Sequence, residues 1–150
     1  LGDPIYHSKF PEIVEMIEKS SIPMSLYTVG SGYNEKWWEY IFAVCTNKDD
    51  RFHFDVDGLQ DTAGTYRKGL IFDQSFNAMR LGALMGANVT WSFPVLKHNQ
   101  HQVGDAYNLA NKNGIRFVVN YSERWDQKDP WKPTLSKKDV DNLVEQCYNN

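Results

Sequence analysis

Cysteine is scarce in this sequence: its 150 residues include only Cys45 and Cys147, and neither belongs to a CxxC pair. Two such thiols cannot form the disulfide framework of a small secreted domain, so a reducing, cytoplasmic compartment fits best. Positive charge is also in short supply, because 16 basic residues stand against 19 acidic ones and no basic stripe is present. General binding to nucleic acid or to an anionic membrane surface is therefore not expected.

Long apolar runs are missing as well. The longest stretch without a charged residue, Leu81 to Leu96, contains Asn88 and Pro94, whereas a membrane-spanning helix needs about 20 mainly apolar residues. No secretory signal is visible. The chain opens with Leu1-Gly2-Asp3-Pro4, which reads as a loop entered halfway, and we expect the sequence to be a piece of a longer protein.

What the sequence does contain is a regular alternation of helix and strand patterns. Apolar residues at 3.6-residue spacing predict amphipathic helices, and alternating or continuous apolar runs predict strands. Strands are predicted to begin near residues 22, 51, 88 and 115, and helix caps are predicted at Ser8, Asn34, Asp73, Asn99 and Ser136. Repeated βα units imply parallel strands with right-handed crossovers. The predicted fold class is therefore α/β, either a doubly wound sheet or part of an open TIM-type barrel, since a complete barrel needs about 250 residues.

Polar residues collect where the predicted strands end, and both layouts place an active site at the carboxyl ends of parallel strands. His53, Asp55 and Asp57 stand at period two on the second predicted strand. Such a row could ligate a divalent metal, supply the two carboxylates of a hydrolase, or form a solvated face. His98 and His101 flank a predicted helix start and could reach one ion or close a turn. These alternatives stay open.

Two other conspicuous segments favour structural roles. Gly30-Ser31-Gly32 lacks the spacing of a nucleotide-binding loop and predicts a simple turn. Trp37-Trp38 fits the core-facing side of a helix better than a platform for a ligand.

Four segments, in their order and spacing, carry a resemblance to a known family: Gly2-Asp3-Pro4, Asp55 to Thr62, Tyr66-Arg67-Lys68-Gly69 and Lys97 to Gln102. They resemble radical S-adenosylmethionine (radical SAM) enzymes, most of all the uncharacterised members found in phages and bacteria. The likeness covers roughly residues 2–125. It implies a partial six-strand βα barrel, entered here at the end of its second strand. Residues 1–125 would form that barrel and residues 126–150 a C-terminal tail and helix.

The resemblance also implies a SAM site at the strand ends. Gly2-Asp3-Pro4 looks like the turn that receives the amino group of SAM, although Asp3 is one methylene shorter than the glutamate usual there. Arg67 is similar to an arginine that could pair with the SAM carboxylate through two parallel hydrogen bonds.

Further residues would hold the nucleoside of SAM. Asp55 and Asp57 lie on the strand whose end contacts the SAM ribose or the substrate, with Asp57 the better placed. Asn99 could hydrogen-bond the ribose hydroxyls, and the backbone around Asn120 would line the adenine. No metal ligand within the chain is implied.

The implied reaction is reductive cleavage of SAM to a 5′-deoxyadenosyl radical, which abstracts hydrogen from a small-molecule or peptide substrate. A [4Fe-4S] cluster, reduced by a protein such as flavodoxin or ferredoxin, would supply the electron. Such clusters need thiolate ligands, and the CxxxCxxC motif of the family is absent. We therefore expect the cluster cysteines upstream of Leu1, while Cys147 could begin a downstream cysteine set or be a lone thiol.

Two hypotheses from other classes remain beside this one. A metal-dependent hydrolase or lyase on a βα barrel would use Asp55, Asp57 and a histidine. A non-catalytic scaffold would keep the fold and bind a partner protein, because a fold alone does not fix a function.

Overall fold

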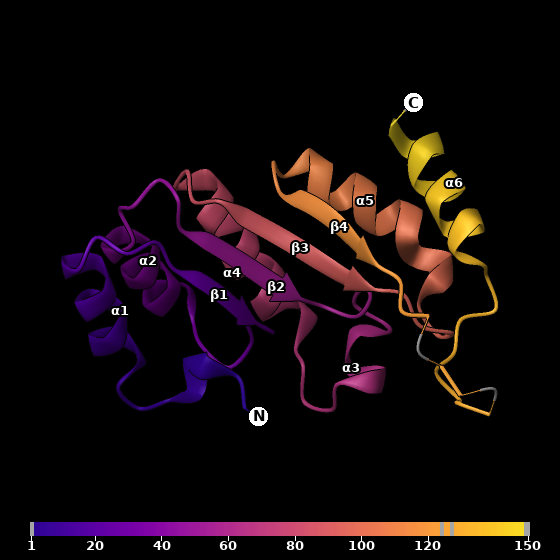
Figure 1. The fold of residues 1–150 in the computed structure, drawn as a ribbon, viewed down its shortest axis with the longest axis horizontal. Helices are drawn as coiled ribbons and strands as arrows, with labels where there is room; N and C mark the ends of the chain where they lie inside the picture. The colour runs from indigo at the N-terminus through magenta and orange to yellow at the C-terminus, as the bar shows by residue number, and fades with distance from the viewer. Residues whose placement is uncertain (1, 124, 127, 149–150) are drawn as a thin grey trace.

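A computed structural model gives the structure of residues 2–123, 125–126 and 128–148. Its centre is one parallel sheet with the strand order β1-β2-β3-β4, so each βα unit adds its strand beside the previous one. The strands are β1 (Ser25–Thr28), β2 (Arg51–Asp55), β3 (Val89–Pro94) and β4 (Arg116–Asn120). All four arrows in Figure 1 point toward the same edge. The predicted α/β class with parallel βα repeats is confirmed.

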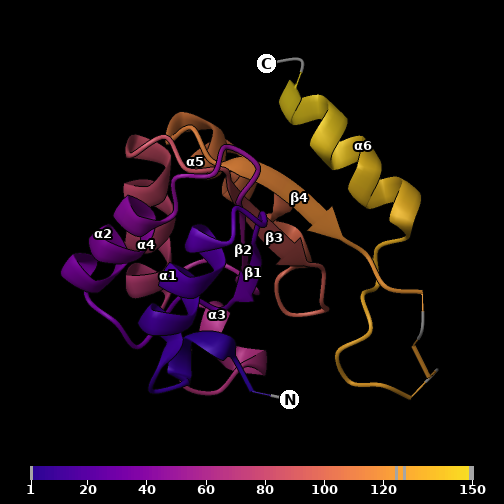
Figure 2. The same cartoon turned by 60° about the vertical axis from the view of Figure 1, so that its left-hand side comes forward.

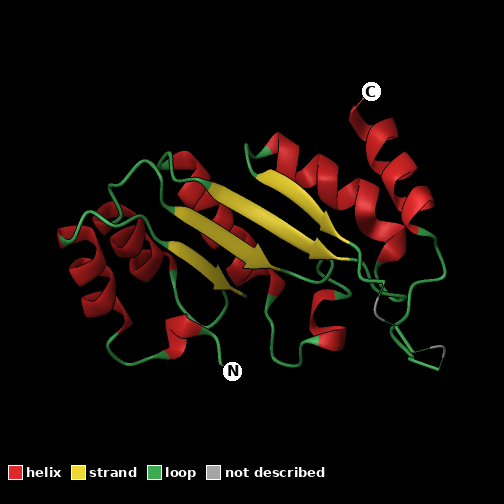
Figure 3. Ribbon diagram, viewed as in Figure 1, coloured by secondary structure: helices red, strands yellow, loops and turns green. Residues whose placement is uncertain are grey.

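The longer helices that precede or connect the strands share one side of the sheet, whereas the short helix between the second and third strands lies beyond the strand ends (Figure 1). The α-helices are α1 (Phe10–Lys19), α2 (Glu35–Val44), α3 (Ala63–Tyr66), α4 (Phe72–Leu84), α5 (Val103–Lys112) and α6 (Lys137–Tyr148), with 3-10 turns η1 (Pro4–Tyr6) and η2 (Gln100–Gln102). Figures 1 and 2 show α1, α2, α4 and α5 on one face, and Figure 3 shows loops at both ends of the strands. Within the described part of the chain, every helix is too short or too polar to cross a lipid bilayer.

The core lies between the sheet and these helices. Alternate residues of a strand point to opposite faces, and on β2 the alternation places Phe52 and Phe54 in the core, at most 1% exposed. Their rings pack against Phe42 and Trp38 of α2, which confirms that Trp38 is a core residue. Trp91 of β3 is fully buried beside Phe54.

The other face of the sheet is polar and no helix in Figures 1 and 2 covers it. His53 and Asp55 of β2 point to this face, and the His53 ring stacks on Tyr27 of β1 with 4.4 Å between centroids. On β3 the paired residues are Thr90 and Ser92. This surface corresponds to the inside of a barrel, because a TIM-type fold keeps its helices outside.

Some helix starts are predicted correctly from the neighbouring residues alone, and others are not. Asn34 caps α2 through a hydrogen bond from Trp37 N–H (3.0 Å), and Ser136 and Asp139 cap α6 reciprocally, as predicted. The prediction that Asp73 caps α4 is wrong, because the helix begins one residue earlier and Asp73 lies in its first turn. There a carboxylate still interacts favourably with the helix dipole. The cap predicted at Ser8 is also wrong: α1 begins at Phe10 after Lys9.

The C-terminal segment packs on the same core as the sheet. Lys97 N–H donates to the Trp131 carbonyl at 2.9 Å, and the Tyr121 hydroxyl donates to the Leu135 carbonyl at 2.9 Å. Helix α6 then lies against α5 with Val140 fully buried and Val144 half-buried. This confirms the prediction that the apolar side of α6 faces the body of the molecule.

β1 is an outer strand of the sheet, and on its far side no described strand pairs with it. A hollow of about 610 Å³ lies beside it. Its apolar lining includes Phe10, Ile13, Ile17 and Leu26.

Candidate functional site

Asp3 ties the N-terminal turn to the end of β1. Its Oδ2 accepts hydrogen bonds from the Thr28 hydroxyl (2.8 Å) and the Val29 N–H (2.7 Å), and its Oδ1 accepts one from Ile5 N–H (3.2 Å). The carboxylate thereby fixes Gly2 and Pro4 beside the carboxyl end of the strand. Two carboxylate oxygens provide about four acceptor positions, so one remains for a further donor such as an ammonium group.

Arg67 lies above a fully buried carboxylate. The Arg67 Nε–H donates to both oxygens of Asp57, at 3.0 and 2.8 Å, while Asp57 is 0% exposed and the Arg67 side chain 37% exposed. Burial raises the pKa of Asp57 to about 6, the charge of Arg67 opposes the rise, and the nearby Asp55 adds to it. No other hydrogen bond of the guanidinium is found among the described residues, so its outer nitrogens can bind an anion.

Asp3, Asp55 and Arg67 line one small cavity of about 190 Å³, together with Gly2, Pro4, Tyr27, Thr28 and Val29. Val29 and Arg67 also line an adjoining cavity of about 410 Å³ under the turn that contains Lys68 and Gly69. A cavity lined by carboxylates and a guanidinium suits a zwitterion, because each charged end of the ligand can meet the opposite charge.

Asn99 is buried and fully engaged. Its amide nitrogen donates to the Asp57 carbonyl (2.9 Å) and the Pro94 carbonyl (2.8 Å), and its oxygen accepts from Leu96 N–H (2.8 Å). The prediction that the Asn99 side chain caps the following helix is therefore wrong, because the preceding turn takes its oxygen and the Asp57 and Pro94 carbonyls take its amide N–H groups. Asn99 lies behind the cavity, where it joins the ends of β2 and β3.

Asn120 lies at the end of β4, away from this cavity. Its amide donates to the Ser92 hydroxyl, and its carbonyl accepts from Val95 N–H at 2.9 Å. It therefore belongs to the same edge of the sheet as Asp55, the register partner of Ser92, but it does not line the cavity.

Gln102 closes the loop after β2, a role that the sequence did not reveal. Its Oε1 accepts hydrogen bonds from Leu59 N–H (3.1 Å) and the Thr62 hydroxyl, and its amide donates to Asp61 at 2.7 Å. The pattern Asn99-x-x-Gln102 resembles a local capping box. The actual hydrogen-bond partners of Gln102 lie in the loop 58–62, about 40 residues earlier in the sequence, and the local pattern does not point to them.

The row His53, Asp55, Asp57 does not form a metal site. β2 ends at Asp55, so the period-two alternation does not extend to Asp57, which is buried on Arg67. His98 is half-buried beside Trp131, and burial lowers its pKa. Among the described residues, one group of three potential metal ligands is found, and it lies elsewhere.

The cysteines do not fit an iron–sulfur cluster. Cys45 follows α2 at the amino-end side of the sheet, and Cys147 lies on α6 with its sulfur 4.0 Å from the Gly104 carbonyl. Neither lines the cavity that holds Asp3 and Arg67, and a [4Fe-4S] cluster needs several thiolates together. The described residues therefore supply no cluster ligands.

The raised pKa of Asp57 predicts a pH dependence of stability. The folded protein keeps the Asp57 proton up to about pH 6, whereas the unfolded chain releases it near pH 4. Folding takes up a proton between these values, so the contribution of Asp57 to the free energy of unfolding falls by up to about 3 kcal/mol as the pH rises from 4 to 6. Urea unfolding at several pH values should show a smaller decline in Asp57→Asn. Equal slopes in the two proteins would contradict the assignment.

The arrangement of parallel βα units, with the polar face opposite the helices, is similar to the fold of solved radical SAM enzymes, and the chain matches part of the length of each. No family model matches the sequence, and no curated protein sequence matches it significantly. The likeness to known proteins is therefore one of fold alone.

Several solved structures share this fold. SuiB from Streptococcus suis superposes with a TM-score of 0.76 at 15% identity, over 99% of this chain and 34% of SuiB. SuiB has also been solved with bound S-adenosylmethionine and with its precursor peptide SuiA. A domain of pyruvate-formate lyase-activating enzyme from Bacteroides vulgatus (TM-score 0.69, 11% identity) is covered over 88% of its length. TYW1 with a lysine-pyruvate adduct (TM-score 0.62, 12% identity) is covered over 48%. In each case 99% of this chain is aligned. The chain spans about a third of the length of SuiB and about half of the length of TYW1.

Proposed function

We propose that residues 1–150 form the SAM-binding part of a radical SAM enzyme. The observation that carries this proposal is the cavity in which Asp3 and Asp55 lie with Arg67, at the carboxyl edge of a sheet of the radical SAM fold. Ligands of open parallel sheets and barrels bind at this edge. The pairing of acidic and basic groups suits the amino acid moiety of SAM.

In this proposal the turn around Asp3 receives the ammonium group of SAM. Asp3 is already held by Thr28 and Val29, so its remaining acceptor position is preorganised. Gly2 and Pro4 shape the turn, and the space beside Gly2 is open, since a β-carbon there would meet no atom within 4 Å. The outer nitrogens of Arg67 bind the SAM carboxylate while its Nε stays on Asp57.

The nucleoside then extends along the strand ends. Asp55 is half-buried in the cavity wall and makes no hydrogen bond to another described residue, so it can accept from a ribose hydroxyl. Asp57 and Asn99 act behind it, since Asp57 orients Arg67 and Asn99 holds the Asp57 backbone. The backbone at Asn120 lines the adenine.

When bound, SAM supplies a sulfonium that can be cleaved reductively to the 5′-deoxyadenosyl group. The electron requires a [4Fe-4S] cluster, which we place on cysteines outside this chain, reduced by a flavodoxin or ferredoxin. We assign the substrate to small molecules or peptides, supported on the peptide side by the precursor peptide bound to SuiB. We place the protein in the cytoplasm, because iron–sulfur chemistry and two unpaired thiols suit a reducing compartment.

Calorimetric titration with SAM tests the proposal directly. The chain is expected to bind SAM saturably and to bind 5′-methylthioadenosine, which lacks the amino acid moiety, at least about tenfold more weakly, because the charge-assisted hydrogen bonds are lost. Asp55→Ala should weaken SAM binding, while Asp105→Ala, an exposed carboxylate on α5, should not.

The outcome that would refute the proposal is a folded chain without saturable SAM binding; it would favour a scaffold. Anaerobic reconstitution of the full-length protein tests the reaction separately. A protein that takes up no iron would exclude the reductive step even if SAM binds.

A further inference from the structure

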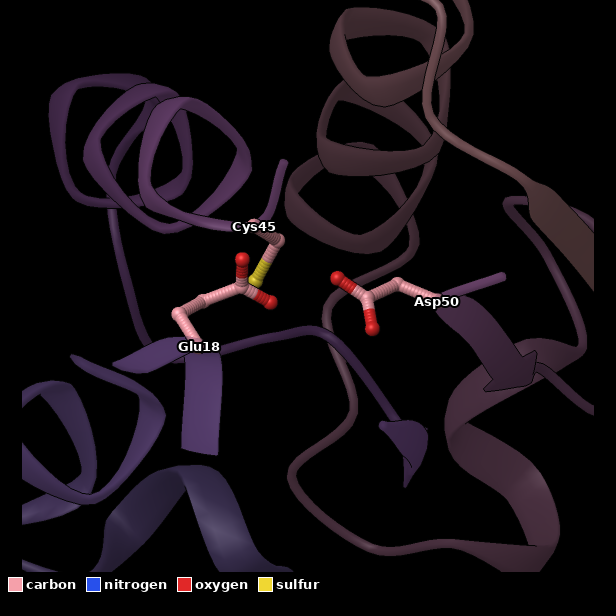
Figure 4. Close-up of side chains that lie close together, drawn as sticks. All are labelled: Glu18, Cys45 and Asp50. Atoms are coloured by element: carbon pink, nitrogen blue, oxygen red, sulfur yellow. The ribbon is translucent and has the colours of Figure 1, made fainter. Parts of the chain in front are cut away.

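Glu18, Cys45 and Asp50 come together at the opposite edge of the sheet from the SAM cavity. Glu18 lies in the last turn of α1, Cys45 caps the end of α2, and Asp50 directly precedes β2. Figure 4 shows the three side chains turned toward one another. One ligand atom from each, two carboxylate oxygens and the sulfur, lie within 4.8 Å of one another.

The structure holds each carboxylate by one oxygen and leaves the other oxygen without a partner. Glu18 Oε2 accepts from the Thr46 N–H (3.0 Å) and hydroxyl (3.1 Å), and Asp50 Oδ1 accepts from Met24 N–H (2.8 Å). Glu18 Oε1 and Asp50 Oδ2 are both buried, and no N–H or O–H group of another described residue reaches them. The two carboxyl groups can hydrogen-bond each other only when they share a proton. Buried polar atoms without a partner are costly, so these two oxygens need either a shared proton or a cation between them.

Among the described residues no lysine or arginine forms an ion pair with Glu18 or Asp50, although the charge of Arg51 acts on Asp50 from farther away. The described ion pairs of lysine and arginine go to other carboxylates: Arg51, the nearest in sequence, contacts Asp49 at 3.9 Å. Asp50 is only 3% exposed. The carboxylates of half-buried Glu18 and buried Asp50 repel each other unless a proton or a cation lies between them.

The metal-free cluster has to retain protons. Burial, with the charges of Asp50 and Glu18, raises the pKa of Cys45 to about 12. Burial and the adjoining Glu18 also raise the pKa of Asp50. A divalent cation would displace the thiol proton and any proton shared by the carboxylates, and it would satisfy all three groups at once.

We propose that Glu18, Cys45 and Asp50 form a three-ligand site for a thiophilic divalent cation, with Zn²⁺ as the fitting ion and water in the fourth position. Thiolate selects zinc over magnesium or calcium, and zinc accepts three protein ligands with one open position. A cavity of about 540 Å³ that Cys45 and Asp50 line gives the ion access from solvent. Zinc bond lengths imply ligand atoms about 3.5 Å apart, so binding needs the three ligand atoms, which now lie within 4.8 Å of one another, to move together by at most about 1.3 Å.

Hydrogen bonds from the protein already hold Glu18 Oε2 and Asp50 Oδ1, the carboxylate oxygens that would not face the ion. Such supporting hydrogen bonds are usual around metal ligands. Binding transfers no electrons and releases only protons. The site lies at the amino edge of the strands and does not depend on the proposed SAM binding, so the two proposals can fail separately.

Zinc titration of the metal-free chain tests the site. At a free Zn²⁺ concentration about 100 times the dissociation constant, the melting temperature should rise by about 5 °C or more. Cys45→Ser should weaken Zn²⁺ binding by at least about 100-fold, and Asp50→Asn, which keeps the acceptor for Met24 N–H, should also weaken it. Cys147→Ser is the matched control and should bind like the unmodified chain. Co²⁺ should give a thiolate-to-metal charge-transfer absorption that Cys45→Ser lacks.

Alkylation supplies a second measurement that does not rest on the stability of a ligand variant. In the Cys147→Ser protein, Cys45 is the remaining thiol, and Zn²⁺ should slow its reaction with iodoacetamide. An unchanged melting temperature and alkylation rate in Zn²⁺ would overturn the proposal. Zinc affinity that survives in Cys45→Ser would overturn it equally.

Discussion

Arg67→Met is expected to lower the free energy of unfolding by about 2 to 3 kcal/mol at pH 7 and to abolish SAM binding. The substitution leaves the Asp57 carboxylate, which is 0% exposed, without its partner. Breaking a buried ion pair on one side typically costs about 3–5 kcal/mol, and the partial exposure of Arg67 places this case at the lower end. Urea unfolding followed by tryptophan fluorescence measures the loss.

Two variants control this experiment. Arg51→Met removes an arginine whose only ion pair among the described residues is an exposed one with Asp49, so it should cost less than about 0.5 kcal/mol. The double variant Arg67→Met/Asp57→Asn should recover much of the stability, because no buried charge remains. The loss in Arg67→Met should also shrink at pH 5, where Asp57 is protonated. A loss equal to that of Arg51→Met would contradict the role of the buried pair.

Gly30→Ala is expected to destabilise the fold by about 3 kcal/mol. Gly30 has φ = +74° in the turn after β1, and a β-carbon there would lie 2.5 Å from the Phe54 ring in the core. The left-handed conformation costs an alanine about 1 kcal/mol, and forcing the buried ring aside adds about 1–3 kcal/mol.

Gly69→Ala separates the two causes. Gly69 also has a positive φ (+89°), but a β-carbon would meet no atom within 4 Å. Its loss should stay near about 1 kcal/mol, since only the backbone conformation is penalised. Thermal unfolding of both variants decides the matter: equal losses would mean that the contact with Phe54 is unimportant.

The fold could be predicted because its signals are local. The alternation on β2 puts Phe52 and Phe54 on one face without help from distant residues, and the cap at Asn34 needs only the next turn of helix. Strand ends were harder to predict. The same alternation continues through Asp57 in the sequence, whereas the strand stops at Asp55.

The site could be predicted only in outline. A resemblance of segments indicated Asp3 and Arg67, which do line one cavity, but it could not show that the Asn99 amide donates to the distant Asp57 carbonyl. Such tertiary hydrogen bonds leave no periodic trace. The same reason hides the cluster of Glu18, Cys45 and Asp50, whose members come from three elements and form no recognisable spacing.

The free outer side of β1 has a consequence for the chain on its own. Its backbone N–H and C=O groups on that side meet no described strand, and apolar residues such as Ile13 and Leu26 line the hollow next to it. An unprotected edge of this kind is a template onto which any extended segment can add. At high concentration two copies would therefore associate through this edge. A βα unit that pairs with the outer side of β1 would cover the edge and prevent such aggregation.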